Sequence, residues 1–248
     1  MRVHLLTAKG VIDIMERNAV YGALTCTGNE YRLAGKTHEC KQFLSDIIAK
    51  GHESVLEHIN LTFRVDGISR ALLQELSRHR HISLSVRSTR STLKKMASSP
   101  VRLHDFYSDL ERILVDACCS APETVEGTDR NRTDVALLED AMKHAVAVVR
   151  SLLCMDPGSP VFVSDYLKYF LPEFVPTSLV MTANLRELRH IFKLRSQPAA
   201  LLEFRRLVLA LYEAIPEEHH YLFDDVLHDG VFSLPEASED GDDGFSEE

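Results

Sequence analysis

The chain has 248 residues, of which 45% are hydrophobic and 26% are charged. These fractions are ordinary for a globular protein and exclude a largely disordered chain. No apolar run approaches the roughly 20 residues that a membrane-spanning helix needs. The opening residues, MRVHLLTAKG, also lack the long apolar stretch of a secretory signal. We therefore expect a cytoplasmic protein with no membrane association.

The formal net charge of −9 is concentrated at the end of the chain. Residues 236–248 carry seven acids and no base, so the rest of the chain carries only −2. A segment of this kind has little to bury and is typical of a solvated tail. We expect a single domain over residues 1–235 and an acidic, disordered tail over residues 236–248.

Neither the cysteines nor the histidines indicate a metal site. The five cysteines form an odd set without a Cys-x-x-Cys pair, so we expect reduced thiols and no disulfide framework. The segment GHESVLEH places His52 and His58 near two acids, but their spacing does not match the i, i+4 pair of a helical zinc site. We expect no metal there, and a corner that lines a ligand site fits better.

The first part of the chain predicts strands and a helix. Val3–Leu6 is expected to form a short strand, and a helix is expected from a cap at Thr37 to about Lys50, ended by Gly51. Apolar and polar side chains alternate over His58–Val65, which predicts a strand with one buried face.

The next segment predicts a turn and a second helix. Asp66-Gly67 is typical of a turn between strands. Ser69 is a suitable cap for the helix that follows, whose buried face would contain Leu72, Leu73 and Leu76.

The second half is mostly helical by pattern. Residues 118–134 are expected to form an inserted surface loop, and a long helix is expected from Thr133. The remaining elements are a helix from Ser159-Pro160, a strand over Ser178–Thr182, a helix over Asn184–Arg195 and a helix from Pro198 to about Ile215. The pattern predicts an α+β fold with helices packed on a small sheet.

The segment Arg78–Lys95, RHRHISLSVRSTRSTLKK, contains six basic residues, six hydroxyl residues and no acid. Arginine forks bind phosphate oxygens in pairs, and hydroxyl groups add donors at short range. This composition favours an anionic ligand. A solvated basic face is one alternative, and a nucleic-acid backbone is another. The lack of interleaved aromatic residues and of overall positive charge disfavours the nucleic acid.

The helix predicted over 184–195 contains a second group of basic residues. Arg186 and His190 share a face at i, i+4. Arg195 lies on the apolar stripe, where a charge is costly to bury without a partner. Two hypotheses stay open for Arg195: an internal ion pair, for example with Glu203, or a guanidinium directed into a pocket for an anionic ligand.

Three motifs occur in a fixed order along the chain. They are GHESVLEH from Gly51, an Arg-His-Arg at Arg78–Arg80 followed by Ser88 and Arg90, and Asn184, Arg186, His190 and Arg195 on the later helix. Together they resemble the signature of the flavin-dependent thymidylate synthases over roughly residues 1–215. The resemblance implies a catalytic domain with helices on a small central antiparallel sheet. It also implies a homotetramer whose active sites are shared between subunits.

The resemblance further implies a reaction, the reductive methylation of dUMP to dTMP. Methylenetetrahydrofolate would be the one-carbon donor, NADPH the reductant and FAD the cofactor. A buried guanidinium beside the uracil would favour negative charge on the ring as the new bond forms. The ring would then react without a covalent cysteine adduct, and no cysteine stands out here as a nucleophile.

Site residues follow from the resemblance position by position, with Arg195 as the catalytic residue facing the uracil ring. The residues implied to contact FAD are Ser54, Arg78, His79, Arg80, Val86, Asn184, Arg186 and His190. Those implied to bind dUMP are Gln74 or Glu75, Arg78, Arg87, Ser88, Thr89, Arg90, Lys168 and Arg195. The stretch from Ser88 to Arg90 and Lys168 would hold the phosphate.

The chain departs from the family pattern at several positions. Ser85 and Val86 replace an Asn-acid pair, and Ser91 stands where many members have tyrosine. Glu75 occupies the place of the usual glutamine, while Gln74 lies one residue earlier, so the dUMP contact stays open between them. Two alternatives therefore remain: a homologue with weakened catalysis that still binds FAD and nucleotide, and a single-stranded nucleic-acid-binding protein.

Overall fold

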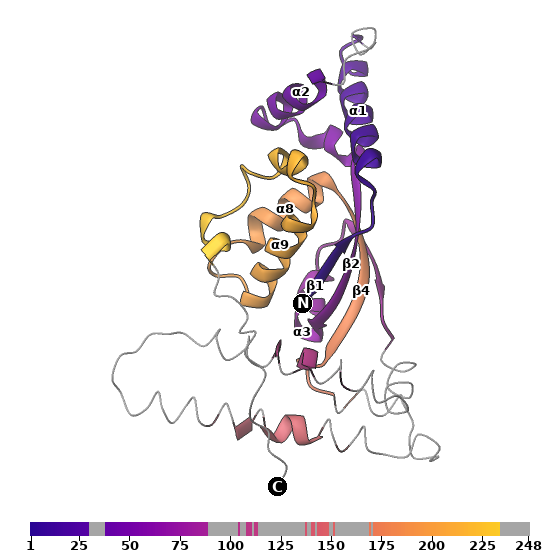
Figure 1. The fold of residues 1–248 in the computed structure, drawn as a ribbon. Coiled ribbons are helices and arrows are strands. Elements are labelled where there is room, and N and C mark those ends of the chain that lie inside the picture. The colour runs from indigo at the N-terminus through magenta and orange to yellow at the C-terminus, as the bar shows by residue number, and fades with distance from the viewer. Residues whose placement is uncertain are drawn as a thin grey trace, which may run out of the picture.

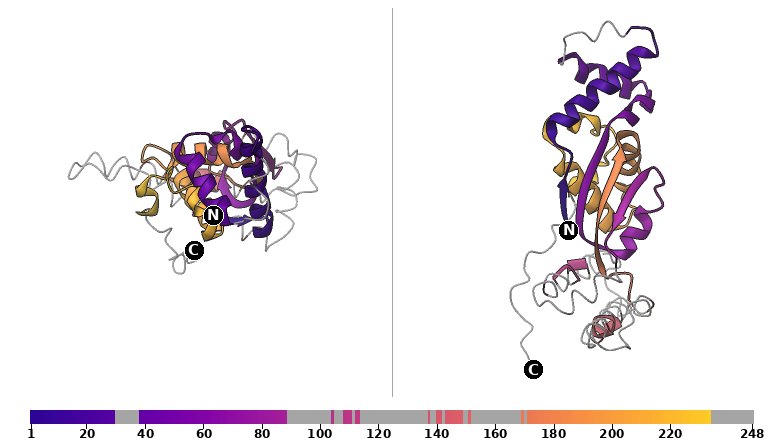
Figure 2. Two further views of the ribbon diagram at one scale, coloured as in Figure 1. Left: turned by 90° about the horizontal axis from the view of Figure 1, so that it is seen from above. Right: turned by 90° about the vertical axis from the view of Figure 1, so that its right-hand side faces the viewer.

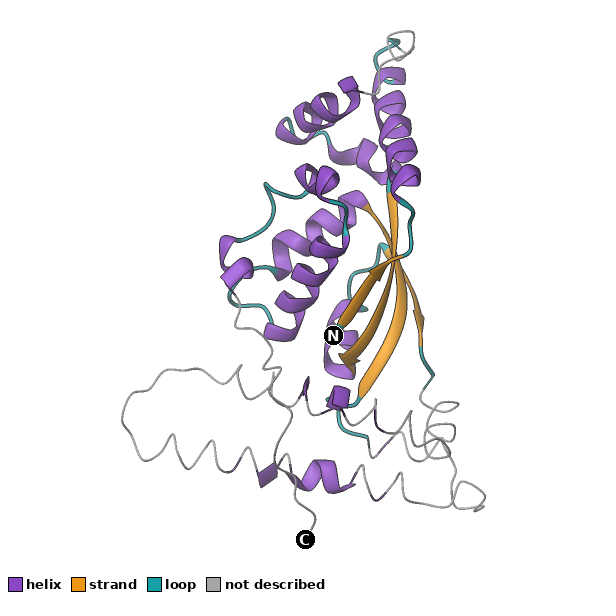
Figure 3. Cartoon of the chain, in the orientation of Figure 1, coloured by secondary structure: helices purple, strands orange, loops and turns teal. Residues whose placement is uncertain are grey.

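The computed structural model describes residues 1–29, 38–88 and 171–233, with residues 104, 108–110, 112–113, 137, 140–141, 143–148, 151 and 169. This part of the chain has an α+β fold, as predicted: helices lie along one face of an antiparallel sheet and at one of its ends (Figure 1). Figure 3 shows the strands as one continuous layer beside the helices. No helix in the described ranges is long and apolar enough to cross a membrane.

The sheet has four strands in the order β1-β2-β4-β3, and all neighbours are antiparallel. The strands are β1 (Arg2–Leu5), β2 (Asn60–Ser69), β3 (Ile82–Val86) and β4 (Pro176–Asn184). The two long central strands are far apart in the sequence, so the sheet joins the N-terminal and C-terminal parts of the chain. The right-hand view in Figure 2 shows the strands side by side with the C-terminal helices behind them.

The alternation predicted for the central strand is confirmed. Leu61, Phe63 and Val65 are at most 1% exposed and belong to the main hydrophobic core. Thr62 lies on the opposite face, where its hydroxyl is 3.0 Å from the hydroxyl of Thr182 on β4. The expected start at His58 is wrong, because His58 closes a 3-10 helix, η2 (Glu53–His58), and the strand begins at Asn60.

The turn predicted at Asp66-Gly67 is also wrong. Strand β2 continues to Ser69, and its register against β4 shifts between Asp66 and Ile68, which is a β-bulge. Gly67 has φ 72°, a conformation that glycine adopts without steric cost. A β-carbon on Gly67 would also lie 2.5 Å from the carboxylate of Asp109. The Asp-Gly pair therefore bends the strand and does not end it.

The helices are α1 (Lys9–Thr25), α2 (His38–Ala49), α3 (Arg70–Leu76), α8 (Leu185–Arg195) and α9 (Leu202–Ala214), followed by the 3-10 helices η4 (Glu217–Leu222) and η5 (Asp229–Ser233). Helix α1 was not predicted. Ile12 and Val20 on one of its faces are buried, but Val11 and Ile14 on the other are exposed. Apolar residues on both faces obscure the period that would reveal an amphipathic helix.

Most of the other predicted elements are confirmed with shifted ends. The last long helix begins at Leu202 and not at Pro198. Of the helix predicted from Thr133, the described residues 143–148 are helical. The predicted loop 118–134, the Thr37 cap, the helix start at Ser159-Pro160 and the tail 236–248 lie outside the described residues. Of the five cysteines, Cys26 and Cys40 are described, and neither forms a disulfide.

Candidate active site

Helix α3 connects the core to the Arg-His-Arg motif, and its first turn is fixed by a buried pair. The Ser69 hydroxyl accepts from the Leu72 backbone N–H at 2.9 Å, as predicted for an N-cap. The same hydroxyl donates to Glu203 of α9 at 2.5 Å, and the Ser69 backbone N–H donates to that carboxylate at 2.8 Å. Because these groups are buried, they fix the helix on α9 and thereby the segment that follows it.

His79, the centre of the Arg-His-Arg motif, is buried between α8 and α9. Its Nδ1 lies 3.3 Å from a carboxylate oxygen of Glu187, and its Nε2 accepts from Arg195 Nε at 3.2 Å. Burial lowers the pKa of His79 and the charge of Arg195 lowers it further, against the opposing effect of Glu187. Since Arg195 only donates, the neutral ring must carry its proton on Nδ1 and donate it to Glu187. The arrangement selects one tautomer.

Arg195 is the last residue of α8 and lies between polar and aromatic partners. Its Nη1 donates to Glu75 at 2.8 Å, and the guanidinium lies 4.7 Å from the centre of the Phe204 ring. The side chain is 19% exposed. Of the two hypotheses for Arg195, the internal ion pair is present, but its partner is Glu75 and not Glu203, which bonds to Ser69. In the described part of the chain, Nη2 of Arg195 has no hydrogen-bond partner, so a donor stays available for a ligand.

The second cluster lies at the other end of α8, beside η2. The Asn184 side chain caps the helix by accepting from the Glu187 backbone N–H at 2.8 Å. Arg186 is exposed and pairs with Glu57 of η2 at 2.6 Å. Ser54, also exposed, follows Glu53 on the same 3-10 helix. Polar groups of η2 and the start of α8 therefore lie together.

Strand β3 ends in the third cluster. Val86 is 38% exposed, and the backbone N–H of Arg87 donates to the Ser178 carbonyl at 2.8 Å. The Arg87 side chain lies 3.8 Å from Asp66. Burial opposes ionisation of Asp66, but the hydrogen bond from Arg64 and the nearby arginine charges leave its pKa lowered. Asp66 is therefore an acid beside the basic segment that the linear sequence does not reveal.

The structure brings some predicted residues together and separates others. His79, Glu75 and Arg195 are in direct contact, and the His190 ring lies 6.0 Å from the His79 ring. Gln74 points elsewhere, since it donates to Glu173 at 2.8 Å. The two ends of α8 lie about 15 Å apart at 1.5 Å per residue. The side chains of Arg78, Arg80 and Ser88 are exposed, while Thr89, Arg90 and Lys168 lie outside the described residues.

Several site residues were not predicted from the sequence. Glu187 is hydrogen-bonded to His79, and the Phe204 ring packs against the guanidinium of Arg195. Arg189 is only 2% exposed and binds two carboxylates. The signal that identified Arg195, a charge on the apolar stripe of its helix, also marks Arg189, which lies between Leu185 and Phe192 on that stripe.

Comparison with known proteins defines the class of this fold and site. Residues 11–219 match the family described as thymidylate synthase complementing protein. A flavin-dependent thymidylate synthase of Campylobacter jejuni is 39% identical over 181 residues, which cover 73% of this chain and 77% of that protein. The Wolinella succinogenes enzyme of the same name is 38% identical over 172 residues, 69% of this chain and 74% of that protein.

A solved structure agrees with this assignment. The flavin-dependent thymidylate synthase ThyX of Helicobacter pylori, complexed with FAD and dUMP, has a TM-score of 0.66 and 28% identity. The match covers 92% of this chain and 100% of that one. The chain belongs to the flavin-dependent thymidylate synthase family, as the order of its three motifs predicted.

Proposed function

We propose that this chain converts dUMP to dTMP, with methylenetetrahydrofolate as the one-carbon donor and NADPH as the reductant. The observation that carries the proposal is the series Glu187, His79, Arg195 and Glu75, in which each member bonds to the next. It runs from the buried Glu187 and His79 to the partly exposed Arg195 and Glu75. This series fixes the Arg195 guanidinium at the end of α8 and leaves its Nη2 without a hydrogen-bond partner among the described residues. A fixed guanidinium of this kind stabilises negative charge that develops on a bound ring.

In this proposal Arg195 contacts the uracil of dUMP, and Glu75 is the residue of the Gln74–Glu75 pair that faces it. Glu75 already touches the guanidinium, whereas Gln74 is bonded to Glu173. Arg78, Arg87, Ser88, Thr89, Arg90 and Lys168 are proposed to bind dUMP, chiefly through its phosphate. The exposed side chains of Arg87 and Ser88, at the end of an anchored strand, support this assignment.

The residues implied to hold FAD suit an anionic, hydrogen-bonding cofactor. Arg78 and Arg80 are exposed, and neither has an ion-pair partner among the described residues. Ser54, Arg186 and His190 add exposed polar groups from η2 and α8, and Val86 adds backbone groups. The Asn184 side-chain oxygen already accepts the cap hydrogen bond from Glu187. Asn184 would therefore bind FAD through the second lone pair of that oxygen or through its side-chain NH2 group. When bound, FAD supplies the hydride that completes the methyl group.

The proposal includes a cytoplasmic homotetramer in which active sites are shared between subunits, with no nucleic-acid partner and no metal. The exposed arginines of the Arg-His-Arg motif support the sharing. They have no ion-pair partner among the described residues, so they are available to a ligand that a second chain also contacts. Cys26 and Cys40 form no disulfide, which agrees with a reducing compartment.

The visible absorption spectrum of the purified protein with FAD tests the proposal, followed by titration with dUMP. We expect a bound-flavin spectrum that changes when dUMP is added. Arg80→Ala should weaken FAD binding, whereas Arg17→Ala, at an exposed arginine of α1, should not. A protein that binds no FAD would contradict the proposal. Binding of both ligands without turnover would favour the weakened homologue.

A further inference from the structure

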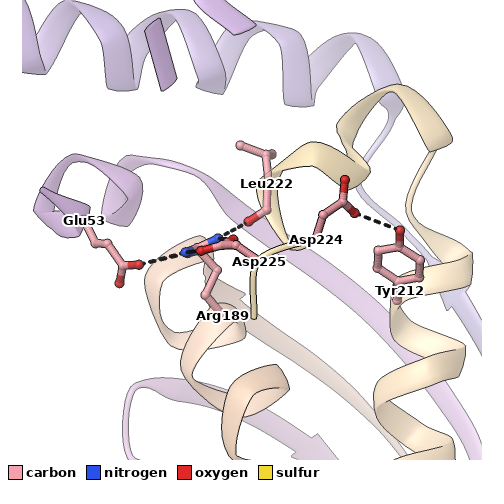
Figure 4. A network of polar contacts seen from close by, with 6 residues as sticks. All are labelled: Glu53, Arg189, Tyr212, Leu222, Asp224 and Asp225. Atoms are coloured by element: carbon pink, nitrogen blue, oxygen red, sulfur yellow. Dashed lines mark hydrogen bonds and ion pairs between the residues drawn. The ribbon is translucent and has the colours of Figure 1, made fainter. Parts of the chain in front are cut away.

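The Arg189 side chain is charged and only 2% exposed, and every nitrogen of its guanidinium is bonded (Figure 4). Nε and Nη2 donate to Glu53 at 3.1 and 2.9 Å. Nη1 and Nη2 donate to the two oxygens of Asp225 at 2.7 and 2.8 Å, and Nη1 also donates to the Leu222 carbonyl. We call Arg189, Glu53, Asp225 and the Leu222 carbonyl the Arg189 clamp.

The Arg189 clamp joins three segments that are far apart in the sequence. Glu53 opens η2, Arg189 lies in the middle of α8, and Asp225 follows η4 near the end of the described chain. The hydrogen bond from Arg189 lowers the pKa of Asp225 against the effect of burial, so its carboxylate is held in the charged form. A bidentate guanidinium–carboxylate pair fixes orientation as well as distance.

Helix η2 depends on such external contacts for its position. It has six residues of 3-10 helix, and its N-cap residue, His52, makes no side-chain cap hydrogen bond. Short 3-10 segments have poor hydrogen-bond geometry and little stability of their own. Two ion pairs fix η2 on α8: the exposed Arg186–Glu57 pair and the half-buried Arg189–Glu53 pair. The Arg189–Glu53 pair is less exposed to solvent, with Arg189 2% and Glu53 31% exposed, and is therefore the stronger constraint.

We propose that Arg189 is a positioning residue for the flavin site. By holding Glu53, it fixes Ser54 next to it in relation to Arg186 and His190 on α8, although Arg189 itself touches no ligand. Through Asp225, the segment after η4 contributes to cofactor affinity from a distance. This inference rests on the proposed function, because it concerns the residues assigned to FAD.

The test compares two adjacent acids after η4. Asp225→Asn removes the charge that pairs with Arg189. Asp224→Asn is the matched control, because Asp224 accepts instead from the Tyr212 hydroxyl at 3.0 Å (Figure 4). We expect Asp225→Asn to weaken FAD binding about tenfold, the effect of one lost charge-assisted hydrogen bond. Asp224→Asn should leave FAD affinity within about twofold, even where both variants lower the unfolding midpoint.

Arg189→Met gives a second arm, in which the charge is removed and an apolar side chain of similar length is kept. If the clamp acts as a unit, FAD affinity in the double variant Arg189→Met/Asp225→Asn equals that of Arg189→Met alone. Hydrogen exchange of the backbone amides of residues 53–58 should also be faster in both single variants, with or without FAD.

The outcomes separate this inference from the function on which it rests. If the unmodified protein binds FAD and Asp225→Asn binds it equally well, the positioning role is wrong and the proposed function stands. Equal losses in Asp224→Asn and Asp225→Asn would show general destabilisation and would also overturn the role. If the unmodified protein binds no FAD, the proposed function fails first.

Discussion

Arg195→Lys separates the charge of Arg195 from its geometry. Lysine keeps the positive charge but has a single nitrogen. That nitrogen can bond to Glu75 or to His79, but it cannot bond to both and also present a donor to a ligand. In the native structure, Nε serves His79 at 3.2 Å and Nη1 serves Glu75 at 2.8 Å. The variant therefore leaves either Nε2 of the buried His79 or the Glu75 carboxylate without its native donor.

The expected magnitudes follow from these contacts. Losing one charged hydrogen bond to a buried acceptor costs about 1.5–3 kcal/mol of stability, which for a chain of this size lowers the unfolding midpoint by about 3–12 °C. Removing a fixed donor from an anion-stabilising site lowers kcat by about 10²–10³. We expect kcat to fall even at temperatures where the variant is fully folded, because the folded variant still lacks a correctly placed donor. The loss of stability therefore does not account for the loss of kcat.

The assay is the release of tritium from C5 of labelled dUMP, with thermal unfolding and the flavin spectrum measured on the same preparation. A variant that binds FAD, is folded at the assay temperature and turns over about 10²-fold more slowly agrees with the reasoning. Turnover within about twofold of the native enzyme would refute it, because charge alone would then suffice.

Three further predictions test the scaffold, the pH dependence and the phosphate site. Ser69→Ala removes an N-cap and a charged hydrogen bond to Glu203, so chemical denaturation should show a loss of about 2–4 kcal/mol; a loss below about 0.5 would contradict the anchoring. Burial opposes protonation of His219, but Glu16 leaves its pKa raised, so its stabilisation is complete below about pH 6.5 and disappears as pH rises through the folded pKa. His219→Gln should remove that part of the pH dependence, and an unchanged curve would contradict it. Arg90→Ala should weaken dUMP binding by about tenfold or more in a titration, and unchanged affinity would argue against a phosphate contact.

Local patterns predicted the parts of the fold that depend on neighbouring residues. The alternation around Phe63 and the cap at Ser69 need only a period and a side-chain type, and both are confirmed. The bulge at Gly67 depends on the register against β4 and on Asp109, which are far away in the sequence. The Asp-Gly pair has the positive glycine φ that such turns require, but the strand continues past it, so the predicted turn is wrong.

The same limit applies to the candidate site. The order of the motifs identified the family and the basic residues of the site. The acid that pairs with each basic residue could be assigned only from the fold. Arg195 pairs with Glu75 and not with Glu203, because Glu203 already anchors α3 through Ser69. Arg189 carried the same stripe signal as Arg195, yet only the structure shows which one is buried.

The central claim is that this chain uses dUMP, FAD and the folate in one active site. The most direct measurement is tritium release from C5-labelled dUMP by the holoenzyme, with NADPH and methylenetetrahydrofolate supplied together or omitted in turn. We predict sustained release and dTMP formation only when both are present. No release and no dTMP in the complete mixture, from a preparation that binds FAD, would contradict the account.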